Sequence, residues 1–195
     1  MNTPTPTRAA LVNGVAWAIP TVAVAGAAPA LAASRPCPTV PSGTGWATIY
    51  SGTLGPSSSG SYSWNSAGTQ WTVYRDNGST TGSLTITTTT TISNLIPGQS
   101  YTMRIPIQWG YGNGIASQST GAIGRVNVGS TTVLSRATRS STGLGTTPGI
   151  ATYTTNSFTA TGTTMQLQYQ VVISARSLQA NDDIIMSLPT FTNCV

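Results

Sequence analysis

The strongest constraint on the fold is a strict alternation of apolar and polar side chains in the second half of the chain. In residues 165–174, Leu167, Tyr169 and Val171 share one parity, whereas three glutamines occupy the other. Successive side chains of a β-strand point to opposite faces of the sheet, so this period of two indicates a strand with one buried and one solvated face. Residues 101–109 alternate in the same way, and residues 34–195 contain no convincing helical pattern. The chain is therefore predicted to be all-β.

Further short segments of the same kind are separated by turns rich in Gly, Pro, Asn and Ser. They predict strands at 46–50, 71–74, 83–93, 122–128, 131–137, 150–158 and 183–191. Threonine, a β-branched residue that suits strands, accounts for 35 of the 195 residues. About nine strands in one domain predict an antiparallel two-sheet β-sandwich. Pro106 has no N–H to donate, which predicts an edge strand or a bulge at that position.

The first 33 residues differ in composition from the rest. Arg8 precedes a run of apolar and small residues that ends in Ala30-Leu31-Ala32. This pattern is typical of a cleaved secretory signal peptide. A membrane anchor is the alternative, but prolines and an asparagine interrupt the apolar run. We therefore predict a signal peptide at 1–33, an extended lead-in at 34–45 and a β-sandwich domain at 46–195, secreted to the extracellular space or the cell surface.

The two cysteines, Cys37 and Cys194, lie near opposite ends of the predicted mature chain. Paired cysteines in an exported protein usually form a disulfide, because the compartment is oxidising. A bond between them would close almost the whole domain into a loop. In the chain-entropy description such a bond contributes up to about 5 kcal/mol to the free energy of unfolding.

The chain is poor in ionisable groups, with eight arginines, three aspartates and no Lys, Glu or His. Without histidine there is no Ser/His or Cys/His nucleophile pair and no imidazole metal site. Asp182 and Asp183 are neighbours on a predicted strand and point to opposite faces, so they do not form a glycosidase pair. The arginines are scattered, which argues against a nucleic-acid surface. The composition therefore predicts a protein that is not an enzyme.

Three short segments of the second half follow one another in a recognisable order. Residues 94–102 (Asn-Leu-Ile-Pro-Gly-Gln-Ser-Tyr-Thr) lead into a strand, residues 158–164 enter the long strand, and residues 181–185 begin the last one. Over about residues 83–193 this order resembles the galactose-binding-like jelly-roll domains, which include many non-catalytic carbohydrate-binding modules of secreted bacterial proteins. The resemblance implies a jelly-roll-like sandwich that binds carbohydrate or a cell-envelope polymer.

The resemblance also implies a candidate structural calcium site at Asp182 and Asp183, the positions where such domains hold the ion. Calcium takes six to eight oxygen ligands, and Asp76 is the only other acid of the chain. The alternative is that these aspartates cap the start of the last strand and accept backbone N–H groups or an arginine such as Arg176.

Sugar binding is favoured by an exposed aromatic ring surrounded by amides and hydroxyls. The glycine-rich segment 109–114 supplies Trp109, Tyr111 and Asn113 beside Gln108, and Trp64 is a second candidate. Trp109 has the inward parity of its strand and is expected in the core, whereas Tyr111 and Trp64 are expected to be exposed. The glutamines of residues 166–170 line either a polar groove or an ordinary solvated face.

Two functional hypotheses remain open. The first is a secreted, non-catalytic module that binds carbohydrate or another envelope polymer through loop aromatics and amides. The second is a structural or adhesive surface protein that acts by self-assembly or protein contacts, without a small-ligand site.

Overall fold

The computed structural model describes residues 37–110, 121–138, 149–176 and 183–192. This part of the chain holds thirteen strands and two three-residue 3-10 helices, η1 (Gly43–Gly45) and η2 (Ser57–Ser59). It contains no helix with the length and hydropathy of a membrane span. The predicted signal peptide and the candidate residues Tyr111, Asn113, Asp182 and Cys194 lie outside the described residues, so the predictions that depend on them stay predictions.

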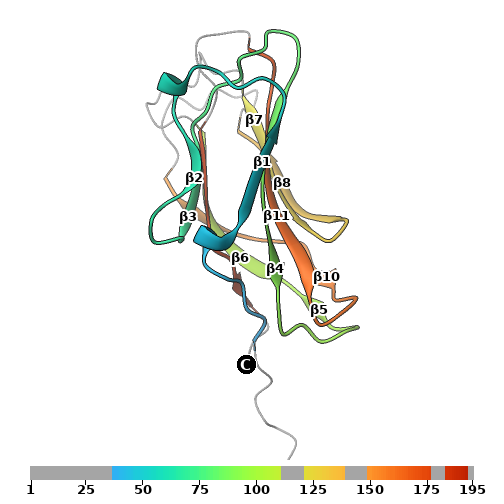
Figure 1. Cartoon of the computed structure of the whole chain (residues 1–195). Coiled ribbons are helices and arrows are strands. Elements are labelled where there is room, and N and C mark those ends of the chain that lie inside the picture. The colour runs from blue at the N-terminus through green and yellow to red at the C-terminus, as the bar shows by residue number, and fades with distance from the viewer. Residues whose placement is uncertain (1–36, 111–120, 139–148, 177–182, 193–195) are drawn as a thin grey trace, which may run out of the picture. The chain divides into compact units, whose positions relative to one another are not determined.

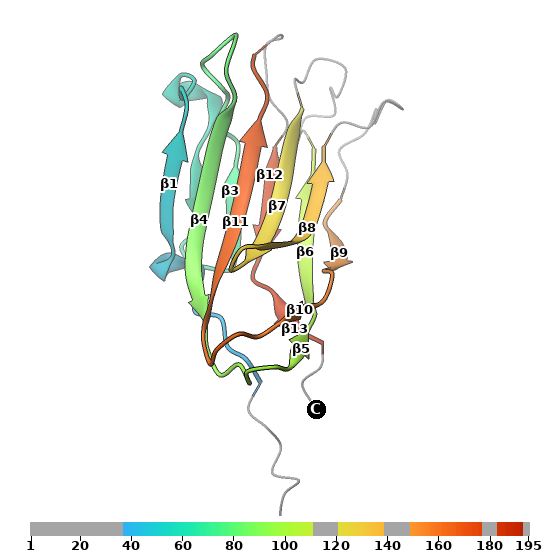
Figure 2. The ribbon, with the colours of Figure 1, turned by 90° about the vertical axis from the view of Figure 1, so that its right-hand side faces the viewer.

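Five strands form the first sheet, which Figure 2 shows from its outer side. In spatial order they are β1 (Ala47–Ser51), β4 (Leu84–Ile92), β11 (Met165–Ile173), β7 (Ala122–Val128) and β8 (Thr131–Ala137). Every neighbouring pair is antiparallel. The two most regular alternating segments of the sequence, β4 and β11, lie in the middle of this sheet, and the predicted hairpin at Gly129 and Ser130 joins β7 to β8.

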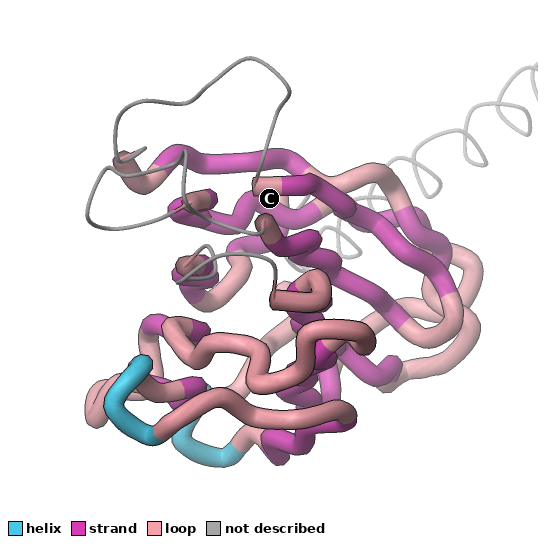
Figure 3. The backbone as a smooth tube through the Cα atoms, turned by 90° about the horizontal axis from the view of Figure 1, so that it is seen from above, coloured by secondary structure: helices cyan, strands magenta, loops and turns pink. Residues whose placement is uncertain are grey.

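The second sheet packs against the first (Figures 1 and 3). Its strands are β2 (Tyr62–Trp64), β3 (Gln70–Val73), β12 (Ile184–Ser187), β6 (Met103–Trp109), β9 (Ala151–Thr154) and β13 (Thr190–Phe191). Arg104 of β6 pairs with Thr154 and with Thr190, which places β9 and β13 on opposite sides of β6. The short strands β5 (Ser100–Tyr101) and β10 (Phe158–Thr159) pair separately.

The chain passes from one sheet to the other at most of its connections. Strands β3, β6, β9 and β12 belong to one sheet, whereas β4, β7, β8 and β11 belong to the other. Each strand therefore buries one face against the opposite sheet and leaves the other face outside, which is what the alternation in the sequence requires. The predicted all-β, antiparallel two-sheet sandwich is confirmed.

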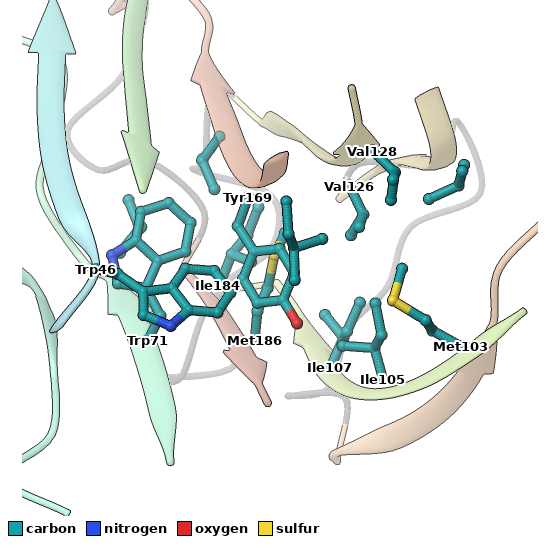
Figure 4. Packing of buried hydrophobic residues seen from close by; sticks show 14 of the residues in the cluster. Trp46, Trp71, Met103, Ile105, Ile107, Val126, Val128, Tyr169, Ile184 and Met186 are labelled. Atoms are coloured by element: carbon teal, nitrogen blue, oxygen red, sulfur yellow. The ribbon is translucent and has the colours of Figure 1, made fainter. Parts of the chain in front are cut away.

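The space between the sheets is filled by apolar side chains of the predicted inward parity (Figure 4). Leu167, Tyr169 and Val171 of β11 are fully buried, and so are Ile105 and Ile107 of β6. The Tyr169 hydroxyl donates to the backbone carbonyl of Ser187 over 2.9 Å. A buried phenol with a hydrogen-bond partner avoids the cost of an unpaired polar group and ties the two sheets together.

Pro106 lies in an interior strand, so the predicted edge position is wrong, and the alternative of a bulge describes the site. Thr155, which follows β9, forms hydrogen bonds with the backbone N–H and C=O of Met103. Backbone groups of successive strand residues point alternately to the two neighbouring strands, so those of Pro106, three residues later, face β12 and β13. On that side the partner strand breaks after Ser187 and resumes at Thr190 with one extra residue. The missing N–H of the proline therefore faces a bulge in its neighbour.

The lead-in is held more firmly than the sequence suggests. Thr39 exchanges two backbone hydrogen bonds with Ser93, both of 3.0 Å, and the amide of Gly43 donates to the carbonyl of Gly68 over 2.8 Å. Backbone hydrogen bonds therefore tie this segment to the β-sandwich. Cys37 itself is exposed, and its disulfide with Cys194 remains a prediction.

The segment 94–102, on which the family resemblance partly rests, is a turn closed by a tyrosine. The amide of Gln99 donates to the carbonyl of Ile96, and Gly98 has a positive φ of 81°. The Tyr101 hydroxyl then accepts a 2.9 Å hydrogen bond from the amide of Ile96. Proline followed by glycine suits such a turn, because proline presets its own φ and glycine tolerates the positive one.

Candidate functional site

The outer side of the five-stranded sheet carries two cross-strand rows of mostly polar residues, one residue from each strand. The Gln168 row consists of Ala47, Thr89, Gln168, Asn127 and Thr132, and the Gln170 row of Ile49, Thr87, Gln170, Arg125 and Ser135. We call these two rows together the amide face. Neighbouring strands lie about 4.8 Å apart, so each row is about 19 Å long.

Hydrogen bonds within the rows hold the long side chains in place. In the Gln168 row, the Asn127 amide nitrogen donates to Oε1 of Gln168 over 2.8 Å, and the Thr132 hydroxyl donates to Oδ1 of Asn127 over 2.7 Å. In the Gln170 row, the Arg125 guanidinium donates to Oε1 of Gln170 over 3.2 Å. Cross-strand pairs of this kind stabilise a sheet modestly and fix the orientation of its side chains.

The donor groups of the two glutamine amides are not used within the described part of the chain. Both side chains are half-buried, and the –NH₂ groups of Gln168 and Gln170 have no partner within the described part of the chain. An arginine has five N–H donors, and Arg125 uses one of them on Gln170. The face therefore offers polar groups that are oriented by the protein and still able to bind.

Aromatic side chains are absent from this face within the described residues. The aromatic residues of the five strands are Tyr50 and Tyr169. Tyr169 points into the core, and Tyr50 pairs with Ile86, a buried residue of inward parity, at the edge of the sheet. Within the described residues, the amide face can therefore form hydrogen bonds with a ligand but offers no aromatic ring for stacking. The site predicted from the sequence depends on such rings.

Trp64 was expected to be exposed, and the structure corrects this expectation. Its indole N–H donates to the buried hydroxyl of Thr88 over 3.1 Å, and its ring lies 4.6 Å from the ring of Trp46. A Cβ on Gly43 would lie 2.0 Å from the Trp64 ring, so only a glycine leaves room for it. The tryptophan therefore closes the edge of the sandwich between β1 and β2. The rings of Tyr50 of β1 and Tyr62 of β2 also meet at this edge, with their centroids 5.9 Å apart.

Trp109 is buried, as its parity predicts, with 4 % of its surface exposed. Its ring packs over Gly124 and lies 5.9 Å from the Tyr153 ring, which is covered in turn by the guanidinium of Arg136 at 5.0 Å. Gln108 points to the outer side of the second sheet, opposite the amide face. The structure therefore separates Gln108, Trp109 and Trp64, and it does not gather them into one site.

Asp183 lies just before β12, one residue outside the strand that the sequence predicts to begin at this position. Its carbonyl accepts the amide of Gly110 over 2.9 Å, and its carboxylate is close enough to Tyr74 to affect that phenol. Burial first, and the charge of Asp183 second, raise the pKa of Tyr74 above its usual 10.0. The described residues contain no group of three or more acidic, Cys or His side chains able to hold a metal ion. Asp182 lies outside them, so the calcium site at Asp182 and Asp183 stays a prediction.

Sequence reasoning found part of the amide face and missed the rest. The alternation placed the glutamines of β11 on an outer face. It did not place Arg125 and Asn127 beside them, because the register between β7 and β11 cannot be read from either strand alone. The only available signal was that Arg125 and Asn127 share the outward parity of their own strand.

The sequence matches no known family and no curated protein. Among solved structures the chain is similar to the PA14 sugar-binding domain of an RTX adhesin, at 15% identity and a TM-score of 0.27 over 62% of this chain and 55% of that one. It is also similar to Fisc, a Stig cyclase from Fischerella sp. TAU, at 15% identity and a TM-score of 0.34 over 77% of this chain and 88% of that one. The chain thus spans just over half of the sugar-binding structure, and likenesses this low carry no functional argument.

Proposed function

We propose that this protein is an exported, non-catalytic binding module of the jelly-roll type that holds a carbohydrate or another cell-envelope polymer on the amide face. The strand order supports this type of sandwich. One sheet contains the strands β3–β12–β6–β9 in spatial order, the other contains β4–β11–β7–β8, and most connections along the chain run from one set to the other. The sequence pattern of residues 1–33 supports export.

One observation carries the proposal. Gln168, Gln170 and Arg125 stand side by side on three neighbouring positions of the sheet, oriented by hydrogen bonds and with donors left over. Sugars present many hydroxyl oxygens, and binding sites recognise such ligands by a few well-placed polar groups. A flat, extended row of donors suits a linear polymer better than a small molecule, which requires a concave pocket.

The inventory of ionisable residues supports a role without catalysis. The chain has no His, Lys or Glu, and the described acids, Asp76 and Asp183, both lie outside the five strands of the amide face. General acid–base chemistry on a bound sugar would require carboxylates on both sides of the bond that breaks. Recognition is therefore the function that this face supports best.

A glycan array followed by isothermal titration tests the proposal. We expect saturable binding to at least one glycan, weakened at least about tenfold in Gln168→Ala/Gln170→Ala, because two directed hydrogen bonds are lost. Gln70→Ala is the matched control, since Gln70 is half-buried on the outer side of the other sheet. Binding that survives the double substitution and is lost in Tyr111→Ala would place the site on the glycine-rich loop instead. Repeating the titration with a chelator tests the predicted calcium site at Asp182 and Asp183.

A second candidate function, self-assembly at the cell surface, is favoured by the edge strand β1. Ile49 and Tyr50 are 65% and 50% exposed, and β1 carries no charge, proline or bulge that would block pairing with another strand. Analytical ultracentrifugation distinguishes the two functions. Assembly predicts oligomers that grow with concentration and are lost in Ile49→Lys, but persist in Ile150→Lys, a matched change at another exposed isoleucine. A monomer at every concentration contradicts this candidate.

A further inference from the structure

We infer that the amide face selects acidic polysaccharides, whose sugar units carry anionic oxygens, over neutral polymers of the same backbone. This inference rests on the proposed function and adds the chemical class of the ligand. It follows from which hydrogen-bonding atoms of the face are already used, and from the charge of the sheet that carries them.

The orientation of Gln170 is set by its neighbour. An arginine side chain only donates hydrogen bonds, so the atom of Gln170 that faces Arg125 at 3.2 Å must be the carboxamide oxygen. The –NH₂ group of Gln170 therefore points away from Arg125 and remains a donor. One acceptor of the face is used, and two sets of donors remain, on Gln170 and on the guanidinium.

In the Gln168 row, too, the amide oxygens accept hydrogen bonds from the protein while an amide –NH₂ group is left without a partner among the described residues. Thr132 donates to the oxygen of Asn127, whose nitrogen donates in turn to the oxygen of Gln168. The chain of hydrogen bonds ends at Gln168 with its –NH₂ group unpartnered among the described residues. Each of the three carboxamide oxygens of the amide face thus already accepts one hydrogen bond from the protein, which leaves it a single lone pair. What the face offers a ligand is mainly N–H, which favours a ligand rich in acceptors.

The charge of the sheet points in the same direction. The five strands contain two arginines, Arg125 and Arg136, and no acidic residue. Arg136 lies over the Tyr153 ring at the edge, so Arg125 is the cation of the amide face itself. The hydroxyls of Thr87, Thr89 and Ser135 bring no charge, and the amides bring none.

Arg125 is also placed to act on an anion. It is half-buried between Gln170 and Ser135, and its bond to Gln170 restricts the motion of the guanidinium. A cation that is partly shielded from water interacts more strongly than one on a mobile, fully exposed side chain. Hydrogen bonds between guanidinium and carboxylate are short and frequently bidentate, which gives them both strength and direction.

The test compares polymers that differ only in charge. We would titrate the purified protein with polygalacturonate and with the same polymer after methyl esterification, which converts the carboxylates to neutral esters. A polymer of glycerol phosphate serves as a second acidic ligand and distinguishes phosphate from carboxylate as the preferred anion. We expect at least one acidic polymer to bind about tenfold or more tightly than the ester, because a hydrogen bond to a charged group contributes more than one between neutral groups.

Two variants locate the effect. Arg125→Gln should abolish the preference for the acidic polymer and leave the binding of the ester nearly unchanged. Arg104→Gln removes the same charge from an exposed arginine on the outer side of the other sheet and should leave the preference intact. Raising the salt concentration should weaken the acidic polymer more than the ester, since the interaction is partly screened.

The outcomes distinguish failure of the anion selection from failure of carbohydrate binding as a whole. Equal binding of the ester and of both acidic polymers, or a preference that falls equally in Arg104→Gln and Arg125→Gln, overturns the selection of anions and leaves carbohydrate binding standing. Absence of binding to these polymers and to every glycan of an array overturns both.

Discussion

The two faces of strand β11 differ in what their side chains contact. Its inner side places Tyr169 in the core between the sheets (Figure 4), where Leu167 and Val171 are also fully buried. Its outer side places Gln168 and Gln170 in half-buried positions, where side chains of β7 donate to their oxygens. The volume of each side chain determines which residues fit on the inner side, because packed interiors tolerate little change in shape. On the outer side, the pairing of hydrogen-bond donors with acceptors determines which residues fit.

Under the proposed function, this contrast assigns stability and recognition to different residues of one strand. Substitutions on the inner side should change the free energy of unfolding and affect binding only through the fold. Substitutions on the outer side should change binding and leave the free energy of unfolding almost unaltered. Four measurements test this contrast.

Replacing the largest inner side chain should have the largest effect. Tyr169 is fully buried between the two sheets, next to Trp46 and Trp71. We expect Tyr169→Ala to lower the free energy of unfolding by about 3–5 kcal/mol, because the substitution leaves a cavity and removes a hydrogen bond. Urea denaturation followed by tryptophan fluorescence measures the change. A loss below about 1 kcal/mol would show that the two sides of β11 do not differ as described.

Adding a methyl group on the inner side should also destabilise the fold. A Cβ on Gly124 would lie 2.1 Å from the Trp109 ring and 2.8 Å from Cε of Met186. Gly124→Ala should lower the free energy of unfolding by about 1–3 kcal/mol, since the core has no room for it. Gly149→Ala is the control, because a Cβ there meets nothing within 4 Å. Equal denaturation midpoints for the two variants would contradict the close packing of Gly124.

Alkaline pH should act on the inner side through Tyr169. Burial raises the pKa of this phenol well above its usual 10.0, so the folded chain keeps the proton that the unfolded chain loses near that pH. Stability is therefore retained below about pH 10 and declines as the pH rises further. Tyr169→Phe should cost about 1 kcal/mol at neutral pH and make the alkaline decline shallower. Denaturation curves from neutral to alkaline pH measure both effects, and an unchanged slope would contradict the assignment to Tyr169.

The smallest effect on stability is expected on the outer side. Gln168→Ala removes one acceptor from a hydrogen-bonded row and should change the free energy of unfolding by no more than about 0.5 kcal/mol. The same variant should weaken glycan binding severalfold in isothermal titration. A variant that unfolds more easily and binds normally would reverse the roles assigned to the two sides.

Much of the fold was predictable from the alternation of side chains. Strands β7 and β8 have the predicted bounds, and β4 and β11 differ from prediction only at their ends. Strand β2 was missed because three residues are too few to show a period, and Trp64 was misplaced because its serine-rich surroundings resemble a loop. The space that receives Trp64 is left by Gly43, far earlier in the chain, and no local pattern reveals such a contact.

The candidate site was predictable only in part. The outward parity of the glutamines followed from β11 alone, whereas the cation beside them did not. Arg125 reaches Gln170 through the register of two strands that lie 45 positions apart in the sequence. Parity within a strand is a local property, but the partner of each residue depends on the topology of the whole sandwich.

The composition of the Gln170 row also has a consequence for how the protein matures. Its members come from segments that begin at residue 47 and end at residue 173, so the row is complete only when all five strands have paired. Contacts between such distant segments form slowly, because much of the chain must be ordered before they are made. Under the proposed function, the binding surface is therefore complete only in the folded sandwich, and a chain that lacks one of the five strands lacks part of the row.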